Sequence, residues 1–228
     1  KITHRRKGSI MLKTEKKIRA ELKRLEKMLY YKRRPLDGWT MKQGYYKKPE
    51  VYNMTLDQWT ELPMGEHIGK KDMTVFLKNQ VVLDREYRGK KTVLLLKVGG
   101  EGCLSINGQH YNGLDYNRNM ILLAESAKGD ETYNIEIETY CKDLILDSAN
   151  IFKTDVVITQ SEIAAIHQSA WDFYFEVKTG FEFTEGGAEE YTKQRVYKLI
   201  YDALLKLDYR NEETFEASVV SAKEYYLQ

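Results

Sequence analysis

The chain has 228 residues, and 42% of them are hydrophobic and 12% aromatic, which is enough apolar material for a sizeable core. Its 36 Lys or Arg and 34 Asp or Glu nearly balance, yet 14 of the basic residues and only 3 of the acidic ones fall within residues 1–34. The sequence shows no signal peptide and no apolar run of about 18 residues, so we predict a folded cytoplasmic protein with no membrane segment.

Residues 1–13 have no periodic apolar pattern, and we predict a flexible extension there. Thr14 is a plausible N-cap, and Pro35 is a plausible stop, so the segment 14–35 is predicted to be a helix. Its apolar residues recur at spacings of four, three and four: Ile18, Leu22, Leu25 and Leu29. This stripe fits a helix packed on the β-sandwich of its own chain and equally a docking or oligomerisation helix.

Glycine and proline interrupt every apolar run between residues 36 and 71, which predicts an irregular segment that wraps the following domain. The interrupting residues are Gly38, Gly44, Pro49, Pro63, Gly65 and Gly69. Five aromatic residues lie in the same segment: Trp39, Tyr45, Tyr46, Tyr52 and Trp59. Aromatic residues in loops seal the edge of a core or stack on a sugar ring, and we favour the sealing role.

Short apolar segments separated by Gly, Asn and Asp predict strands over residues 73–83, 92–98, 103–106, 121–123, 133–140 and 155–159. Asn107-Gly108 is a typical hairpin turn, and residues 133–140 alternate as a half-buried strand does. The predicted fold is therefore mainly β with flanking helices, with an antiparallel jelly-roll sandwich of galactose-binding-like type over residues 36–160.

Two helices are predicted near the C-terminus, one from Glu190 to Leu207 and one that Asn211 caps and that runs to Tyr226. The segment 170–183 is ambiguous from its residues. Its apolar residues alternate as in a strand: Phe173, Phe175, Val177, Phe181 and Phe183.

Several motifs occur in a characteristic order along the chain. They are Arg34-Pro35-Leu36-Asp37-Gly38-Trp39, the segment 72–77, VGGEGCLSINGQHYNGLDYN at 98–117, and Trp171-Asp172-Phe173-Tyr174. In this order they resemble the N-terminal accessory domain of family 38 glycoside hydrolases, the α-mannosidases of the bacterial and fungal cytosolic branch, over roughly residues 14–228. The resemblance implies a helix over 170–183 and a helical linker over 161–228 that leads toward a catalytic domain.

In that family the catalytic domain begins with a His-x-His-x-Asp type motif that holds zinc beside a carboxylate nucleophile. The four histidines of this chain are scattered: His4, His67, His110 and His167. The resemblance therefore implies a non-catalytic region of a zinc-dependent retaining α-mannosidase, with no metal ligand and no catalytic residue in this chain. The expected partners are its own catalytic domain, a mannose-containing glycan and further copies of the chain.

The best candidate site is the loop after the Asn107-Gly108 turn, with residues suited to sugar hydroxyls: His110, Tyr111, Asp115, Tyr116, Asn117 and Arg118. The same residues suit a turn that contacts the catalytic domain, and we favour that role. Four carboxylates lie near glycines and are interpreted as solvated rather than catalytic: Glu101, Asp115, Glu185 and Glu189.

Cys103 and Cys141 are predicted to be two buried thiols rather than a disulfide. Two alternative functions use other features of the chain. A stand-alone carbohydrate-binding module would need exposed aromatic residues in the segment 110–118. An adaptor for an anionic partner would use the basic helix, although the aromatic platforms and polar base readers of nucleic-acid sites are missing.

Overall fold

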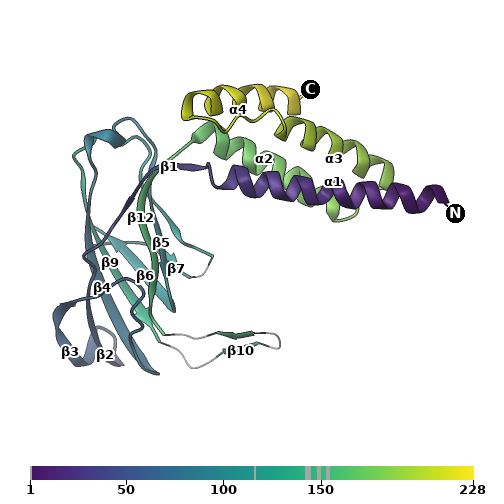
Figure 1. Ribbon diagram of the computed structural model, residues 1–228. Helices are drawn as coiled ribbons and strands as arrows, with labels where there is room; N and C mark the ends of the chain where they lie inside the picture. The colour runs from purple at the N-terminus through teal and green to yellow at the C-terminus, as the bar shows by residue number, and fades with distance from the viewer. Residues whose placement is uncertain (1, 116, 142–144, 148–149, 153–154) are drawn as a thin grey trace. The chain divides into compact units, whose positions relative to one another are not determined.

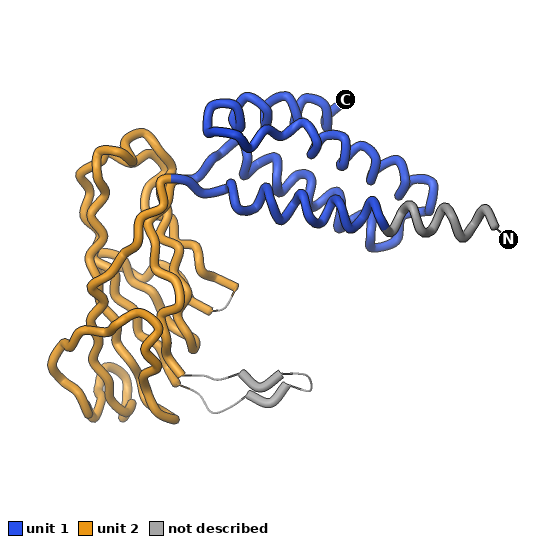
Figure 2. Tube along the Cα trace, viewed as in Figure 1, with its two compact units in different colours: residues 1–31, 166–228 blue, residues 32–165 orange. Residues whose placement is uncertain are grey.

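The chain forms two compact units, a helical unit of Lys1–Tyr31 with Ile166–Gln228 and a β unit of Lys32–Ala165 (Figure 2). The computed structural model describes residues 2–115, 117–141, 145–147, 150–152 and 155–228 (Figure 1). The predicted fold class, mainly β with flanking helices and a β-sandwich, is confirmed. No helix in the described part of the chain is long and apolar enough to cross a membrane.

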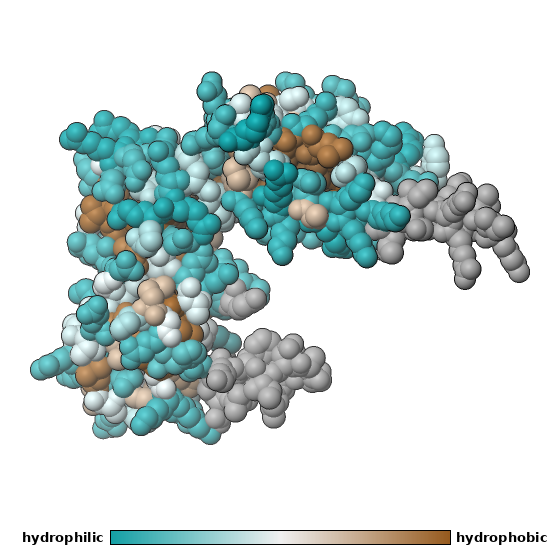
Figure 3. All heavy atoms as spheres, in the orientation of Figure 1, coloured by the Kyte–Doolittle hydropathy of each residue, from teal (hydrophilic) through white to brown (hydrophobic). Residues whose placement is uncertain are grey.

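Four helices make up the helical unit: α1 (Ile2–Glu26), α2 (Gln168–Glu185), α3 (Glu190–Leu204) and α4 (Glu212–Tyr226). All four contribute to one buried core, whose larger members include Ile18, Leu25, Phe173, Phe181, Tyr197, Ile200, Phe215 and Val219. The apolar stripe of α1 thus packs against α2–α4, which neither of the two interpretations from sequence described. Much of the visible surface of this unit is hydrophilic (Figure 3).

Helix α1 does not have its predicted bounds. It begins at Ile2, whereas a flexible extension was predicted over residues 1–13 and the start of the helix at Thr14. The helix ends at Glu26, and strand β1 (Tyr30–Pro35) replaces the last part of the predicted helix. Lys32 has a φ of 47°, which a continuing helix excludes, and β1 is an edge strand, where proline is tolerated.

The segment 36–71 was predicted to be irregular, but most of it forms a hairpin of β2 (Thr40–Lys48) and β3 (Val51–Glu61). Gly44 does not break β2. A β-carbon on Gly44 would lie 2.8 Å from the carbonyl oxygen of Asn53, so glycine permits the close approach of β3. The prediction of a wrapping loop is therefore wrong over residues 40–61.

Two antiparallel sheets form the β unit. The six-stranded sheet has the order β3-β2-β4-β9-β6-β7, and the four-stranded sheet has the order β1-β12-β5-β8. Their remaining strands are β4 (Met73–Val82), β5 (Thr92–Val98), β6 (Glu101–Ile106), β7 (Gln109–Leu114), β8 (Met120–Ala124), β9 (Thr132–Tyr140) and β12 (Ile158–Ile166). A separate pair consists of β10 (Ile145–Asp147) and β11 (Asn150–Phe152). Apolar residues of both sheets are buried, among them Val75, Leu77, Leu94, Leu96, Leu104, Ile121, Ile137 and Ile163.

The predicted Asn107-Gly108 hairpin joins β6 to β7, and both residues have the positive φ that such a turn requires, 52° and 77°. The following strand, β7, occupies part of the predicted loop 110–118. The strand predicted over 155–159 lies later in the chain. It is β12, which pairs with β5 up to Ala165 and so takes the first residues of the predicted helical linker.

The ambiguous segment 170–183 is helical, as the family resemblance implied. Its buried residues follow helical spacing: Ala170, Phe173, Tyr174, Val177, Phe181 and Thr184. Phe175 and Phe183 are 41% and 82% exposed, so the apparent alternation joins residues from opposite faces of α2. The predicted cap is also confirmed, because the Asn211 side chain accepts the backbone N–H of Thr214 at 2.9 Å. Cys103 and Cys141 are free thiols, as predicted, and Cys141 is buried, but Cys103 is exposed, so the prediction that both are buried is wrong for Cys103.

Candidate functional site

The sequence-predicted site falls into two parts, and the first is the turn between β7 and β8. Asp115 accepts hydrogen bonds from the backbone N–H groups of Asn117 at 2.8 Å and Arg118 at 2.9 Å. Its second carboxylate oxygen lies 2.7 Å from the Arg118 guanidinium, and these hydrogen bonds lower the pKa of Asp115. The three residues therefore stabilise their own turn. Tyr116 lies outside the described residues.

The second part consists of His110 and Tyr111 on β7. Their side chains diverge, because neighbouring residues of a strand face opposite sides of a sheet. His110 pairs with Ser105 in the β6–β7 register, and its Nδ1 lies 3.3 Å from Ser105 Oγ and 3.5 Å from Cys103 Sγ. The sequence showed no such cysteine–histidine arrangement, since only the hairpin register brings the two side chains together.

The four candidate carboxylates do not converge on one site. Glu101 lies on β6 and Asp115 in the following turn, whereas Glu185 and Glu189 belong to the helical unit. Glu185 binds the Arg19 guanidinium at 2.6 Å. Among the described residues, no group of three His, Cys, Asp or Glu side chains is arranged to hold a metal ion.

His110 instead contributes to a groove on the six-stranded sheet, which we call the sheet groove. The cavity has a volume of about 410 Å³. Each of the six strands contributes to its lining, through Lys42, Asp57, Trp59, Phe76, Glu136, Glu138, Cys103, Ser105 and His110 among others. These side chains lie opposite the core face, as the pairings Lys42 with Phe76 and Phe76 with Glu138 show.

One end of the sheet groove is an aromatic platform. The Trp59 side chain is 43% exposed, so part of its ring is accessible. Lys42 Nζ and Lys78 Nζ lie 5.2 and 5.6 Å from the centroid of this ring, within cation–π range. Lys42 Nζ also lies 3.3 Å from a carboxylate oxygen of Asp57. The two ammonium groups lie over the ring, hold it in place and supply hydrogen-bond donors beside it.

Trp59 reaches Lys42 because β3 bulges at this point. Met41 pairs with Thr60, and Gln43 pairs with Leu56. Between these two pairs β2 has only Lys42, whereas β3 has the three residues 57–59. A bulge of this kind redirects side chains out of the regular pleat, and here it brings Asp57 and Trp59 to one lysine.

The centre of the groove is acidic. Glu136 and Glu138 alternate with the buried Ile135 and Ile137 along β9, so both carboxylates project from the same face. The Tyr52 hydroxyl donates a hydrogen bond to Glu138. Burial, followed by this hydrogen bond to Glu138, raises the pKa of Tyr52 to about 12, so the hydroxyl keeps its proton and remains a donor. Glu138 is therefore held in place at the floor of the groove.

Sequence reasoning identified parts of the sheet groove without joining them. Trp59 was among the aromatic residues considered for sugar stacking, and the alternation over residues 133–140, which include Glu136 and Glu138, predicted a strand with one face in water. The signal that could have joined them is strand register. Outward residues of neighbouring strands form rows across a sheet, but the rows become visible only when the pairing is known.

The basic helix proposed for an anionic partner has two cations that are already engaged. Arg19 binds Glu15 and Glu185, while Lys17 lies 5.4 Å from the ring centroid of Tyr201. These contacts anchor α1 within the helical unit.

Comparisons with known proteins give a partial similarity of fold. No family model matches the chain, and no curated protein matches it. A solved structure of β-glucuronidase from Ruminococcus gnavus in complex with D-glucaro-δ-lactam is 13% identical, with a TM-score of 0.41, and the match covers 60% of this chain and 30% of that chain. Another structure of the Ruminococcus gnavus enzyme is 14% identical, with a TM-score of 0.40 and coverages of 60% and 29%. The match thus spans less than a third of those chains.

Proposed function

We propose that this chain is a non-catalytic, sugar-binding region of a glycosidase, and that the sheet groove holds one residue of a glycan. The observation that carries the proposal is the exposed Trp59 ring in the same groove as Glu136 and Glu138. A pyranose ring presents C–H groups on its face and hydroxyls around its rim. Stacked on Trp59, it would direct hydroxyls toward carboxylates that accept hydrogen bonds and toward lysines that donate them.

The more specific proposal is that the glycosidase is an α-mannosidase of the family 38 type and that the glycan contains mannose. Its support is the order of the motifs at 34–39, 72–77, 98–117 and 171–174. In this proposal the nucleophile, the acid and the zinc ion belong to a catalytic domain of the same cytoplasmic enzyme. The sheet groove would hold a part of the glycan that is not being cleaved.

The sugar-binding proposal is tested by calorimetric titration of the chain with α-mannose oligosaccharides. Trp59→Ala should weaken binding about tenfold, because it removes the stacking surface. Tyr111→Ala is the matched control, since Tyr111 is 44% exposed on the same unit and lies outside the groove. If Tyr111→Ala lost binding and Trp59→Ala kept it, the site would be the segment 110–118. Absence of binding by the unmodified chain to these and to other glycans would overturn the proposal.

The α-mannosidase proposal has a separate test. An aryl α-mannoside and an aryl β-glucuronide are incubated with zinc and either this chain or a longer protein that contains it. We expect hydrolysis of the α-mannoside by the longer protein alone. Hydrolysis of the glucuronide instead, or of neither compound, would refute the α-mannosidase assignment and leave the binding test unaffected.

A further inference from the structure

The helical unit contains a second concave site, between α1 and the loop that joins α3 to α4. The cavity has a volume of about 460 Å³ and is lined by Arg24 and residues 205–210. We call it the basic pocket, because Arg24, Lys206 and Arg210 line it and Asp208 is the acidic residue among its lining. It belongs entirely to the helical unit and does not share a residue with the sheet groove.

Arg24 is held in the basic pocket by an aromatic ring. Its guanidinium carbon lies 3.9 Å from the ring centroid of Tyr209, and the Tyr209 ring in turn stacks on the buried Phe215 at 5.6 Å. A guanidinium that stacks through its face keeps its N–H groups free along its edge. No ion pair joins Arg24 to another residue in the described part of the chain. Burial, followed by the nearby Glu21 carboxylate, raises the pKa of the Tyr209 hydroxyl.

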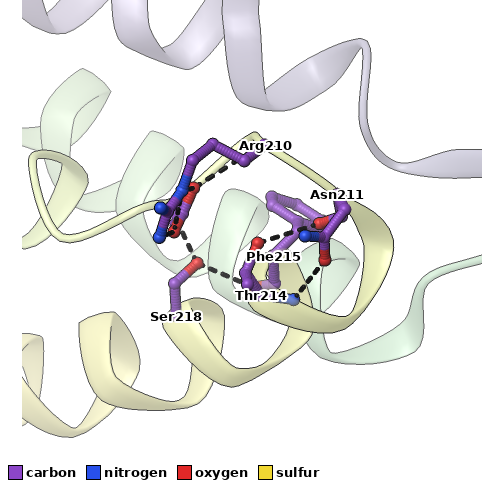
Figure 4. A network of polar contacts seen from close by, with 6 residues as sticks. Arg210, Asn211, Thr214, Phe215 and Ser218 are labelled. Carbon is purple, nitrogen blue, oxygen red and sulfur yellow. Dashed lines mark hydrogen bonds and ion pairs between the residues drawn. The ribbon is translucent and has the colours of Figure 1, made fainter.

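The loop that carries Arg210 is fixed by a hydrogen-bond network (Figure 4). Asp208 binds Arg210 Nε with both carboxylate oxygens at 2.9 Å, and the Asp208 backbone N–H donates to Ser218 Oγ at 2.9 Å. Asn211 caps α4 directly after the loop. The Asp208 contacts use Nε and Nη2 of Arg210, which leaves the donors of its other terminal nitrogen for a ligand.

Lys206 completes the cationic side of the pocket, with its Nζ 4.7 Å from the ring centroid of Tyr225. Two of the three cations are therefore placed by aromatic rings and the third by a carboxylate. Positions fixed before binding reduce the entropy cost of ordering long side chains around a ligand.

We propose that the basic pocket binds the phosphate group of a small phosphorylated ligand. The two guanidinium groups and the ammonium group carry three positive charges, of which Asp208 offsets one, and the remaining two match the charge of about −2 of a phosphate. The three cations can donate hydrogen bonds to several phosphate oxygens. The volume of about 460 Å³ is larger than a phosphate requires and leaves room for an attached group of sugar size. A nucleic acid would need a longer row of free cations than the three of this pocket, and Arg19 and Lys17 on the same helix do not extend the row because they are engaged within the helical unit.

The test is a titration of the ¹⁵N-labelled chain, followed by NMR, with inorganic phosphate and with a hexose phosphate at constant ionic strength. We expect saturable shifts of the backbone amides of residues 205–211 and tighter binding of the hexose phosphate. Arg24→Gln should weaken both about tenfold, because it removes charge-assisted hydrogen bonds. Arg195→Gln is the matched control, since Arg195 also lies on a tyrosine ring, that of Tyr191, but outside the pocket.

Three results would overturn the proposal. The first is absence of saturable shifts at residues 205–211, and the second is equal weakening by Arg24→Gln and Arg195→Gln. The third is a short RNA that binds more tightly than the hexose phosphate and shifts amides along α1. If the spectrum of Arg24→Gln showed a misfolded protein, Lys206→Gln would replace it, because Lys206 is exposed and its loss should weaken phosphate binding without disturbing the core.

Discussion

Replacement of Gly180 by alanine should lower the free energy of unfolding of the unmodified chain and raise that of a Tyr226→Phe variant. Helix propensity alone predicts that alanine in the interior of α2 stabilises the helix by about 1 kcal/mol. In the structure, however, a β-carbon at Gly180 would overlap the hydroxyl oxygen of Tyr226, and the next nearest atom, Tyr226 Cζ, lies 3.7 Å away. The obstacle is therefore one oxygen atom.

The magnitude follows from two opposing terms. Inserting a methyl group into a packed site costs about 1–3 kcal/mol, and the gain in propensity offsets about 1 kcal/mol of it. Tyr226 cannot turn aside freely, because its ring packs edge-to-face on Phe173 and Lys223 of the same helix binds Glu176 of α2 at 2.7 Å. We expect Gly180→Ala to lower the free energy of unfolding by up to about 2 kcal/mol. In a Tyr226→Phe background the same change should raise it by about 1 kcal/mol.

Urea unfolding monitored by the far-ultraviolet helical signal measures both effects, with the four proteins of the cycle compared at equal concentration. The reversal of sign is the informative result. If Gly180→Ala stabilised the unmodified chain, or destabilised both backgrounds equally, the contact between Gly180 and the Tyr226 hydroxyl would not be the reason for glycine at this position.

Three further predictions concern single contacts. Ser161→Ala should lower the free energy of unfolding by about 1–3 kcal/mol in urea denaturation, since it leaves the buried Trp39 Nε1–H, now 2.9 Å from Ser161 Oγ, without an acceptor. Asn211→Ala should cost the helical unit about 1 kcal/mol through loss of the α4 cap, whereas Asn211→Gly should cost a few tenths, and equal losses would contradict a capping role. A carbon-13 NMR titration should show the pKa of the Asp115 carboxyl below its ordinary value of 3.8, so the stabilising pair with Arg118 is present at neutral pH and is lost as the pH falls through the lowered pKa. Arg118→Gln should raise the pKa of Asp115, and an unchanged pKa would refute the pairing.

The parts of the fold that were predicted correctly depend on local signals. The alternation along β9, the Asn107-Gly108 turn and the Asn211 cap each need only neighbouring residues, and each is present as predicted. The segment 170–183 shows the limit of such signals. Its phenylalanines alternate like a strand, yet Phe183 is largely exposed, and only packing against the other helices decides which residues are buried.

The errors share a physical cause, which is contact between distant residues. Gly44 was interpreted as a break because a glycine next to a partner strand cannot be distinguished from a glycine in a loop by sequence. Strand β1 was interpreted as helix because its pairing with β12 lies more than a hundred residues away in the chain. The candidate site failed in the same way, since the residues near Asp115 bind one another while His110 belongs to a groove defined by register.

The bulge in β3 offers a direct test of whether register makes the sheet groove. Deletion of residues 57 and 58 leaves one residue, Trp59, opposite Lys42 and restores regular pairing between Met41–Thr60 and Gln43–Leu56. The core faces of β4 and β9 are not altered, so urea unfolding should show a folded β unit. Glycan binding should fall, because the deletion removes Asp57 from Lys42 and moves the indole from its bulged position to the place directly opposite Lys42. A folded deletion variant with unchanged glycan affinity would show that the bulge does not create the binding surface.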